Sequence, residues 1–286
     1  MKQRIITAAM GLLVLLAAFF LFETLIANLL LAGICAVAVL ELLNAAGLTK
    51  YKVLSTVSIL YSFFLMFVNA GNMMDYMSVC STAYAIFCFG YLIVRHNDIN
   101  IREISYCLLI TVIVTLSFFM LISIRDRSNA QIGLFYLLVV FGSAWWSDSG
   151  AYFAGTFFGK HKLCPSISPK KTVEGLVGGI VTAVLGNLLV AELFMWASQM
   201  LIPIGYFSHC VAINIPILIL VTPLLSLMGV LGDLSASVIK RQCNIKDFGN
   251  IMPGHGGIMD RFDSVLFIAP VVFLIFRFFP LLTVVS

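Results

Sequence analysis

The stretch "ISYCLLITVIVTLSFFMLISI", residues 104–124, contains no charged side chain and is long enough to cross a membrane as a helix. Similar apolar runs recur along the whole chain. Of its 286 residues, 61% are hydrophobic and only 10% are charged, whereas soluble domains have about 25% charged residues. Long continuous apolar runs indicate helical spans rather than a barrel. The sequence therefore predicts an all-α, polytopic integral membrane protein.

Apolar runs of about 20 residues predict about nine transmembrane helices. The first run continues too far for a cleavable signal peptide, so we expect a retained span. The first two runs are close together, and either a tight hairpin or a shallow re-entrant pair fits them. Glu41, near the end of the second run, is expected at the membrane interface. The nine expected spans cover residues 5–22, 25–43, 53–70, 76–94, 104–124, 132–152, 176–197, 211–232 and 264–284.

Lysine and arginine are distributed asymmetrically over the predicted loops. One side holds 14 of the 17 basic residues, in the N-terminus and the loops 44–52, 95–103, 153–175 and 233–263. Because basic residues accumulate in cytoplasmic loops, we expect this side in the cytoplasm and the C-terminus outside. We divide the chain into N-terminal transmembrane helices, 1–103, and a C-terminal catalytic transmembrane region, 104–286, which includes the cytoplasmic loops 153–175 and 233–263.

The seven cysteines form no CxxC pair and no metal-ligand spacing. Cys35, Cys88 and Cys107 fall inside apolar runs, where cysteine behaves as a small hydrophobic residue. We therefore expect the cysteines to be packing residues.

Aspartates are concentrated around the last polar loop. Asp233 stands at a predicted membrane boundary, and Asp260 and Asp263 are spaced i, i+3, which would place them on one helix face. Carboxylates at membrane depth are costly and usually face a cavity or hold a partner. Their hard oxygen atoms suit Mg²⁺, which is often held by one or two carboxylates and substrate phosphates. The alternative is that they are interfacial carboxylates in ion pairs with Lys240 and Arg261.

Basic residues stand beside these aspartates. Ser237, Lys240 and Arg241 are spaced i, i+3, i+4 and are expected on one helix face with Asp233. A cluster of cations next to a metal site suits a phosphate-rich substrate. The alternative is ordinary basic flanking of a membrane span.

The glycine-rich segment "PGHGG", residues 253–257, lies in the same loop. Glycines allow positive φ angles and let backbone N–H groups approach a ligand closely. His255 in this setting could contact phosphate or transfer protons. A structural histidine fits the sequence equally well.

The other polar loop contains a second group of basic residues. Ser168 and Pro169 resemble an N-cap followed by proline at the first helical position. Lys170, Lys171 and Thr172 would then lie in the first turns of a helix, which is an anion-binding geometry. The alternative is a basic patch attracted to anionic lipid.

The stretch "SVIKRQCNIKDFGNIMPGHGGIMDRFD", residues 237–263, resembles the signature of phosphatidate cytidylyltransferases, also called CDP-diacylglycerol synthases. The elements S-x-x-K-R, K-D, P-G-H-G-G and D-R-x-D are all present at the right spacing. The segments "SDSGAY" (147–152), "FFGKHK" (157–162) and "SPKKTVEG" (168–175) are also similar to the family. The resemblance covers the C-terminal half strongly and the N-terminal spans only in general character.

The resemblance implies the reaction of CTP with phosphatidate to give CDP-diacylglycerol and pyrophosphate. It implies Mg²⁺ held by Asp233 and Asp260, with Asp263 close by and a monovalent cation such as K⁺ as a further candidate. It assigns His255 to phosphate positioning rather than to proton abstraction. The expected catalytic residues are Asp233, Lys240, Arg241, His255, Asp260 and Arg261. The expected substrate-binding residues are Asp148, Lys160, Ser168, Lys170, Lys171, Thr172, Glu174, Ser237, Lys246, Asp247, Gly254, Gly256 and Gly257.

The expected partners are CTP, phosphatidate and the lipid bilayer, with a homodimer left open and no nucleic acid. The expected location is the bacterial cytoplasmic (inner) membrane, with the active site on its cytoplasmic surface. Two rival classes remain. A CTP-dependent polyprenol kinase would use a neutral alcohol and need a base, whereas a transporter would place acids along the middle spans. The charges here gather at one face, which disfavours transport.

Overall fold

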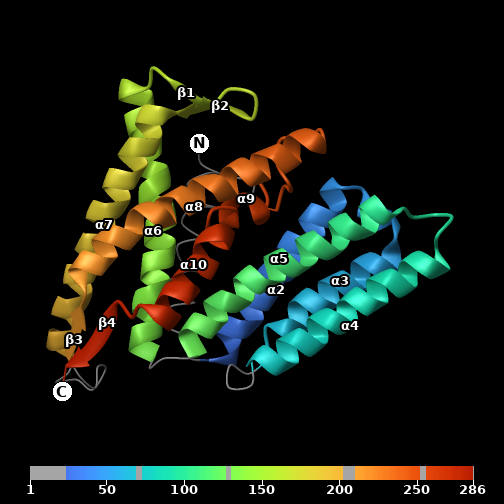
Figure 1. Cartoon of the computed structure of the whole chain (residues 1–286), viewed down its shortest axis with the longest axis horizontal. Coiled ribbons are helices and arrows are strands. Elements are labelled where there is room, and N and C mark those ends of the chain that lie inside the picture. Colours follow the sequence, from blue (N-terminus) through green and yellow to red (C-terminus); the bar gives the residue numbers. More distant parts are fainter. Residues whose placement is uncertain (1–23, 69–72, 127–129, 202–209, 252–255, 286) are drawn as a thin grey trace. The chain divides into compact units, whose positions relative to one another are not determined.

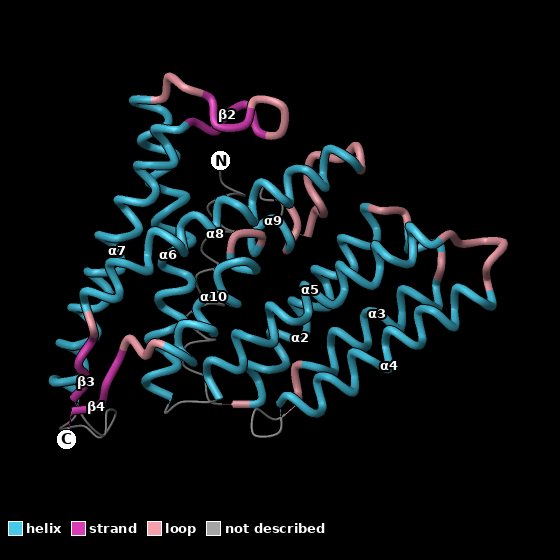
Figure 2. The backbone as a smooth tube through the Cα atoms, viewed as in Figure 1, coloured by secondary structure: helices cyan, strands magenta, loops and turns pink. Residues whose placement is uncertain are grey.

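A computed structural model describes residues 24–68, 73–126, 130–201, 210–251 and 256–285 of the chain (Figure 1). The expected span 5–22 lies outside these residues. The described part is mainly helical, and its strands form two short antiparallel pairs (Figure 2). The helices are α2 (Leu25–Ala45), the 3₁₀ helix η1 (Leu48–Lys50), α3 (Lys52–Leu65), α4 (Met73–Val94), α5 (Ile101–Asp126), α6 (Ala130–Phe158), α7 (Val173–Leu201), α8 (Ile215–Gln242), α9 (Met259–Phe262) and α10 (Val265–Phe278). The strands are β1 (Lys162–Cys164), β2 (Ser168–Thr172), β3 (Cys210–Ile213) and β4 (Leu282–Val285).

The chain divides into two compact units. Unit 1 comprises Met1–Ser123 and Ile239–Phe262, and unit 2 comprises Ile124–Val238 and Asp263–Ser286. The division does not follow the expected boundary at residue 103. Instead, the helices α5 and α8 each begin in one unit and end in the other, so the signature segment contributes residues to both units.

Unit 1 is built around α2, which packs along α3, while α3 packs along α4. Small residues let membrane helices approach closely, and the buried face of α2 is rich in them. A buried hydrogen bond of 2.7 Å joins Ser58 Oγ of α3 to the Tyr84 hydroxyl of α4. The fully buried side chains of α2 are Ala32, Cys35, Ala38, Val39, Leu42 and Leu43.

Unit 2 is built around α6 and α7, which lie side by side (Figures 1 and 2). Glycines permit their close approach. A Cβ atom at Gly150 would overlap the Thr182 side chain, and one at Gly186 would overlap the Trp146 ring. The Thr182 hydroxyl also donates a hydrogen bond of 3.0 Å to the Trp146 carbonyl. Van der Waals packing and interhelical hydrogen bonds of this kind hold membrane helices together.

The expected spans are confirmed as helices but not in all their boundaries. Each of the eight expected spans within the described residues contains a helix. Six of the described helices are long and apolar enough to cross a membrane, whereas α3 and α10 are shorter. The count of nine spans therefore stays a prediction.

Two expected spans include strands. Residues 210–213 form β3, so the helix expected from 211 begins only at Ile215, and residues 282–285 form β4 after α10 has ended at Phe278. The two strands pair in register from Cys210↔Val285 to Ile213↔Leu282. These β-branched and apolar residues satisfy the hydropathy of a span, but their side chains also favour a strand that has a partner.

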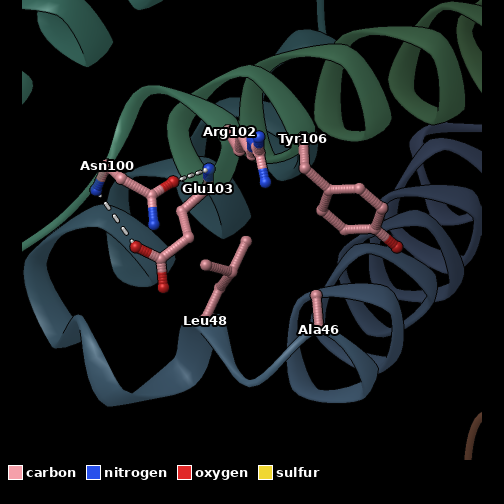
Figure 3. A pocket seen from close by; sticks show the side chains of 6 residues that line it. All are labelled: Ala46, Leu48, Asn100, Arg102, Glu103 and Tyr106. Carbon is pink, nitrogen blue, oxygen red and sulfur yellow. Dashed lines mark hydrogen bonds between the residues drawn. The ribbon is translucent and has the colours of Figure 1, made fainter. Parts of the chain in front are cut away.

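An open hollow lies at the N-terminal end of α5 in unit 1 (Figure 3). Asn100 and Glu103 close this helix end with a reciprocal capping box, since the Glu103 N–H donates to Asn100 Oδ1 at 3.0 Å and the Asn100 N–H to Glu103 Oε2 at 3.1 Å. Lys50 Nζ pairs with Glu103 at 2.9 Å. None of the residues predicted for the active site lines this hollow, so we assign it to the architecture of the helix end. Its lining residues are Ala46, Leu48, Asn100, Arg102, Glu103 and Tyr106.

Candidate active site

Helix α8 carries the first part of the signature. The helix continues to Gln242, so Asp233 lies inside it and not at the beginning of a loop as predicted. Residues four apart on a helix are neighbours, and Ser237 Oγ lies 3.5 Å from Asp233 Oδ1, to which it donates. The predicted shared face of Asp233 and Ser237 is therefore confirmed. Hydropathy shows where the side chains become polar, but the helix continues beyond this point because its backbone hydrogen bonds do not depend on apolar side chains.

Asp233 also forms an ion pair within unit 2. Lys171 Nζ lies 2.6 Å from Asp233 Oδ2, and the two side chains are 24% and 31% exposed. Lys171 belongs to β2, which pairs with β1 in the hairpin between α6 and α7. Both residues were predicted for the site. Their ion pair was not predicted, because it depends on the position of the hairpin next to α8 in the fold.

The predicted helix start at Ser168 is wrong. Ser168 is the first residue of β2, and α7 begins at Val173. The N-cap is Thr172, whose Oγ1 accepts the N–H of Gly175 at 3.1 Å, the usual bond from N-cap to N3. The pairing Lys162↔Thr172 and Cys164↔Ser168 places the preceding residues in a strand. The two lysines therefore lie on a strand and not in a helical first turn.

Glu174 shapes the same hairpin. Its carboxylate accepts the N–H of Lys160 at 3.1 Å and of His161 at 3.2 Å, and it pairs with His161 Nδ1 at 2.6 Å. These bonds fix the entry of the chain into β1. Lys160 and Lys170 are exposed on the hairpin. A contact of Glu174 with substrate stays a prediction.

Asp263 approaches α8 at Gly232, within unit 2. A Cβ atom at Gly232 would overlap the Asp263 carbonyl oxygen and lie 3.0 Å from the Phe267 ring. Glycine is therefore required for this close approach, which brings the backbone of Asp263 against the residue that precedes Asp233. The Asp263 carboxylate also accepts the N–H of Ser264 at 2.8 Å. The fold thus brings the backbone of Asp263 close to the chain segment that carries Asp233.

Asp260 lies in unit 1 and is almost fully buried. Its side chain is 5% exposed, and Lys240 Nζ lies 2.7 Å from its Oδ1. Its Oδ2 accepts the N–H groups of Phe248 at 2.9 Å and Gly257 at 3.0 Å. The ion pair with Lys240 was the predicted alternative to a metal site, and it is present. Helix α9 ends at Phe262, so the predicted helix face shared by Asp260 and Asp263 is wrong.

Glu41 was not predicted for the site. It is 5% exposed, and it accepts the N–H of Ile258 at 3.1 Å and of Met259 at 2.9 Å. Its expected place at the membrane interface stays a prediction. Its partners lie at the end of the segment that runs from α8 to the first residue of α9, residues 243–259, which we call the signature loop. Helix α2 packs against α9. The only available signal was a lone acid inside an otherwise apolar run, which usually holds a partner.

The remaining predicted residues are placed as follows. Asp148 lies inside α6, which extends to Phe158. Gly256 has a φ of +85°, which confirms the predicted need for glycine there. Gly254 and His255 lie outside the described residues. The exposed residues of the set are Asp148, Arg241, Lys246, Asp247 and Arg261.

The carboxylates of unit 2 are of the chemical type that a hard divalent cation prefers. Asp233 and Asp263 supply carboxylate oxygens, the donor type that Mg²⁺ prefers, and the backbone approach at Gly232 brings their chain segments together. Asp260 fits less directly, because both of its oxygens already accept hydrogen bonds or pair with Lys240. Within the described residues, no three His, Cys, Asp or Glu side chains form a group that could hold a metal by themselves.

Comparison with known proteins identifies the family. A sequence model of the cytidylyltransferase family matches residues 2–279. The chain belongs to the cytidylyltransferase family. Phosphatidate cytidylyltransferase of Bacillus subtilis (strain 168) is 35% identical over 287 residues, which cover 98% of both chains. The corresponding enzymes of Staphylococcus haemolyticus and Staphylococcus epidermidis are 33% and 34% identical, over 95% of this chain and 97% of theirs. The family resemblance expected from residues 237–263 is confirmed, and it extends to the N-terminal helices.

Proposed function

We propose that this protein transfers CMP from CTP to phosphatidate, giving CDP-diacylglycerol and pyrophosphate for phospholipid synthesis. The observation that carries this proposal is the family match over residues 2–279, together with relatives named phosphatidate cytidylyltransferase that align over nearly their full length. The apolar helices agree with a lipid substrate, since they are long enough to cross a bilayer.

In the proposed reaction, a phosphate oxygen of phosphatidate attacks the α-phosphorus of CTP. The bond between this phosphorus and the bridging oxygen to the β-phosphate breaks, and pyrophosphate leaves. The attacking phosphate is already anionic at neutral pH, because phosphomonoesters have a second pKa of about 6. No strong general base is required, which distinguishes this reaction from phosphorylation of a neutral alcohol.

The residues of the chain would bind and orient the phosphates. Lys171 and Lys240 each end beside a carboxylate in a partly or largely buried setting, where charge interactions are stronger than in bulk water. Arg241 is exposed one residue after Lys240 and is suited to bind a phosphate from solution. The backbone of the glycine-rich loop and His255 would position the same groups, as the family resemblance implies.

The same proposal places Mg²⁺ on Asp233 and Asp260 with Asp263 close by, as the family resemblance implies, and a monovalent cation such as K⁺ in the same site. When bound, Mg²⁺ would neutralise negative charge on the transferred and leaving phosphates. We further propose that the site faces the cytoplasm at the bacterial inner membrane, because 14 of the 17 basic residues fall on that side of the predicted topology. A homodimer is consistent with this proposal.

The test uses purified protein, phosphatidate, Mg²⁺ and CTP labelled at one position at a time. Label in the α-phosphate or in cytosine is expected in the extracted lipid, and label in the γ-phosphate is expected in pyrophosphate. A γ-label in the lipid would instead identify a lipid kinase and reject the proposal.

A further inference from the structure

Glu41 is a buried carboxylate that no part of the signature accounts for. It lies near the C-terminal end of α2, and its side chain is directed to the backbone of the signature loop. Its Oε1 accepts the N–H of Ile258 and its Oε2 that of Met259, at 3.1 and 2.9 Å. Hydrogen bonds to an ionised acceptor are roughly twice as strong as neutral ones. A buried carboxylate thus holds two residues immediately before Asp260.

The loop is shaped to fit around this carboxylate. A Cβ atom at Gly257 would lie 2.5 Å from both Glu41 oxygens, and one at Gly249 would also overlap the carboxylate. Distances this short are not tolerated, so glycine is required at both positions for the loop to approach Glu41. Two separate segments of the loop therefore close on one side chain.

Glu41 and Asp260 divide the backbone N–H groups of this segment between them. Asp260 accepts from Gly257, and Glu41 accepts from Ile258 and Met259, so three consecutive amides are fixed by two carboxylates. Asp260 in turn holds Lys240 and the N–H of Phe248. The position of the Lys240 ammonium group thus depends on a chain of contacts that begins at Glu41.

We propose that Glu41 is a positioning residue for the active site, which fixes the signature loop and through it the Asp260–Lys240 pair. This proposal rests on the proposed function, since Asp260 and Lys240 are taken from it as catalytic. Glu41 acts through the backbone amides of residues 257–259 and contacts neither substrate in this role.

The test is Glu41→Gln, which keeps the size of the side chain but replaces one oxygen by an NH₂ group. This group faces a backbone N–H, so one of the two bonds is lost. We expect hydrogen exchange in a peptide covering residues 256–262 to become faster. We also expect kcat to fall by about 10²-fold, the effect of a displacement of about 1 Å, with less change in KM, since binding is retained while transition-state geometry is lost.

The matched control is Asn28→Ala in the same helix. Asn28 is buried and its Nδ2 donates to the Met66 carbonyl at 2.9 Å, away from the loop. Its loss should lower the melting temperature in detergent without changing exchange at 256–262 or kcat. If Glu41→Gln does not fold, Gly249→Ala displaces the carboxylate from the loop side and should produce the same two effects.

Two outcomes would reject the positioning role. One is normal kcat in the folded Glu41→Gln protein, and the other is a loss of kcat with wild-type exchange at 256–262. The exchange measurement does not depend on the reaction. If the wild type transferred no CMP, the proposed function would fail, whereas faster exchange would still show that Glu41 holds the loop.

Discussion

Replacement of Asp260 by Asn should destabilise the protein strongly as well as inactivate it. The Asp260 and Lys240 side chains are 5% and 15% exposed, so loss of the negative charge leaves a largely buried ammonium group without compensation. Breaking such a pair costs about 3–5 kcal/mol. The amide cannot avoid this cost by rotating. Its NH₂ group faces either the Lys240 ammonium or the N–H groups of Phe248 and Gly257.

The measurement is paired: unfolding in detergent and CMP transfer as a function of Mg²⁺ concentration. We expect a loss of about 3–5 kcal/mol in stability and a loss of at least ~10²-fold in activity, as for removal of an electrostatic contact to the transition state. The double variant with Lys240→Met should recover most of the stability, because no charge is stranded, but none of the activity. Asp98→Asn, whose exposed pair with Arg95 lies outside the predicted site, is the control and should leave activity unchanged. If Asp260→Asn unfolds like the wild type, the ion pair does not exist in the folded protein and the reasoning fails.

Further predictions concern the rest of the site. Asp233→Asn should lower CMP transfer by at least ~10²-fold and change its Mg²⁺ dependence. The free energy of unfolding should fall by only about 0–1 kcal/mol, because the pair of Asp233 with Lys171 is partly exposed. Normal Mg²⁺ dependence would remove Asp233 from the metal site. Thr172→Ala should lower the free energy of unfolding by about 1 kcal/mol, because α7 loses its N-cap. Ser168→Ala should leave the free energy of unfolding unchanged. The reverse result would restore the helix start expected from the sequence. In protein without native cysteines, Cys at the exposed positions 162 and 250 should react with impermeant reagents only from the cytoplasmic side, and Cys at 129 only from outside. Labelling of 162 and 250 from opposite sides would overturn the predicted topology.

The helices could be predicted because hydropathy is a local property of the sequence. A run such as 104–124 can bury its backbone in a bilayer only as a helix, and the structure has α5 there. The ends of the helices follow other forces. Helix α8 extends to Gln242 beyond the apolar run, and residues 282–285 form a strand only because β3 is available as a partner. Neither is visible in hydropathy.

The site was predictable in its residue types and less so in its contacts. The hydrogen bond between Asp233 and Ser237 follows from helical spacing. The ion pair between Asp233 and Lys171 instead joins α8 to a hairpin that is distant in the sequence. The bond from Met259 to Glu41 spans 218 residues of sequence. No local pattern encodes such a contact, and a lone acid in an apolar run indicates only that some partner exists.

The two lysine–aspartate pairs impose a condition on phosphate binding. In each pair the lysine is already neutralised, Lys171 by Asp233 and Lys240 by Asp260. If a phosphate group binds the lysine in place of the aspartate, the carboxylate loses its partner. The carboxylate is partly or largely shielded from water, and an unpaired charge in such a position is costly. A cation that arrives with the nucleotide would remove this cost, because Mg²⁺ binds carboxylates and phosphates together. Binding of CTP should therefore be much weaker without divalent cation, even before any chemistry takes place. Equal affinity for CTP with and without Mg²⁺, measured on the wild type in the absence of phosphatidate, would contradict this exchange of partners.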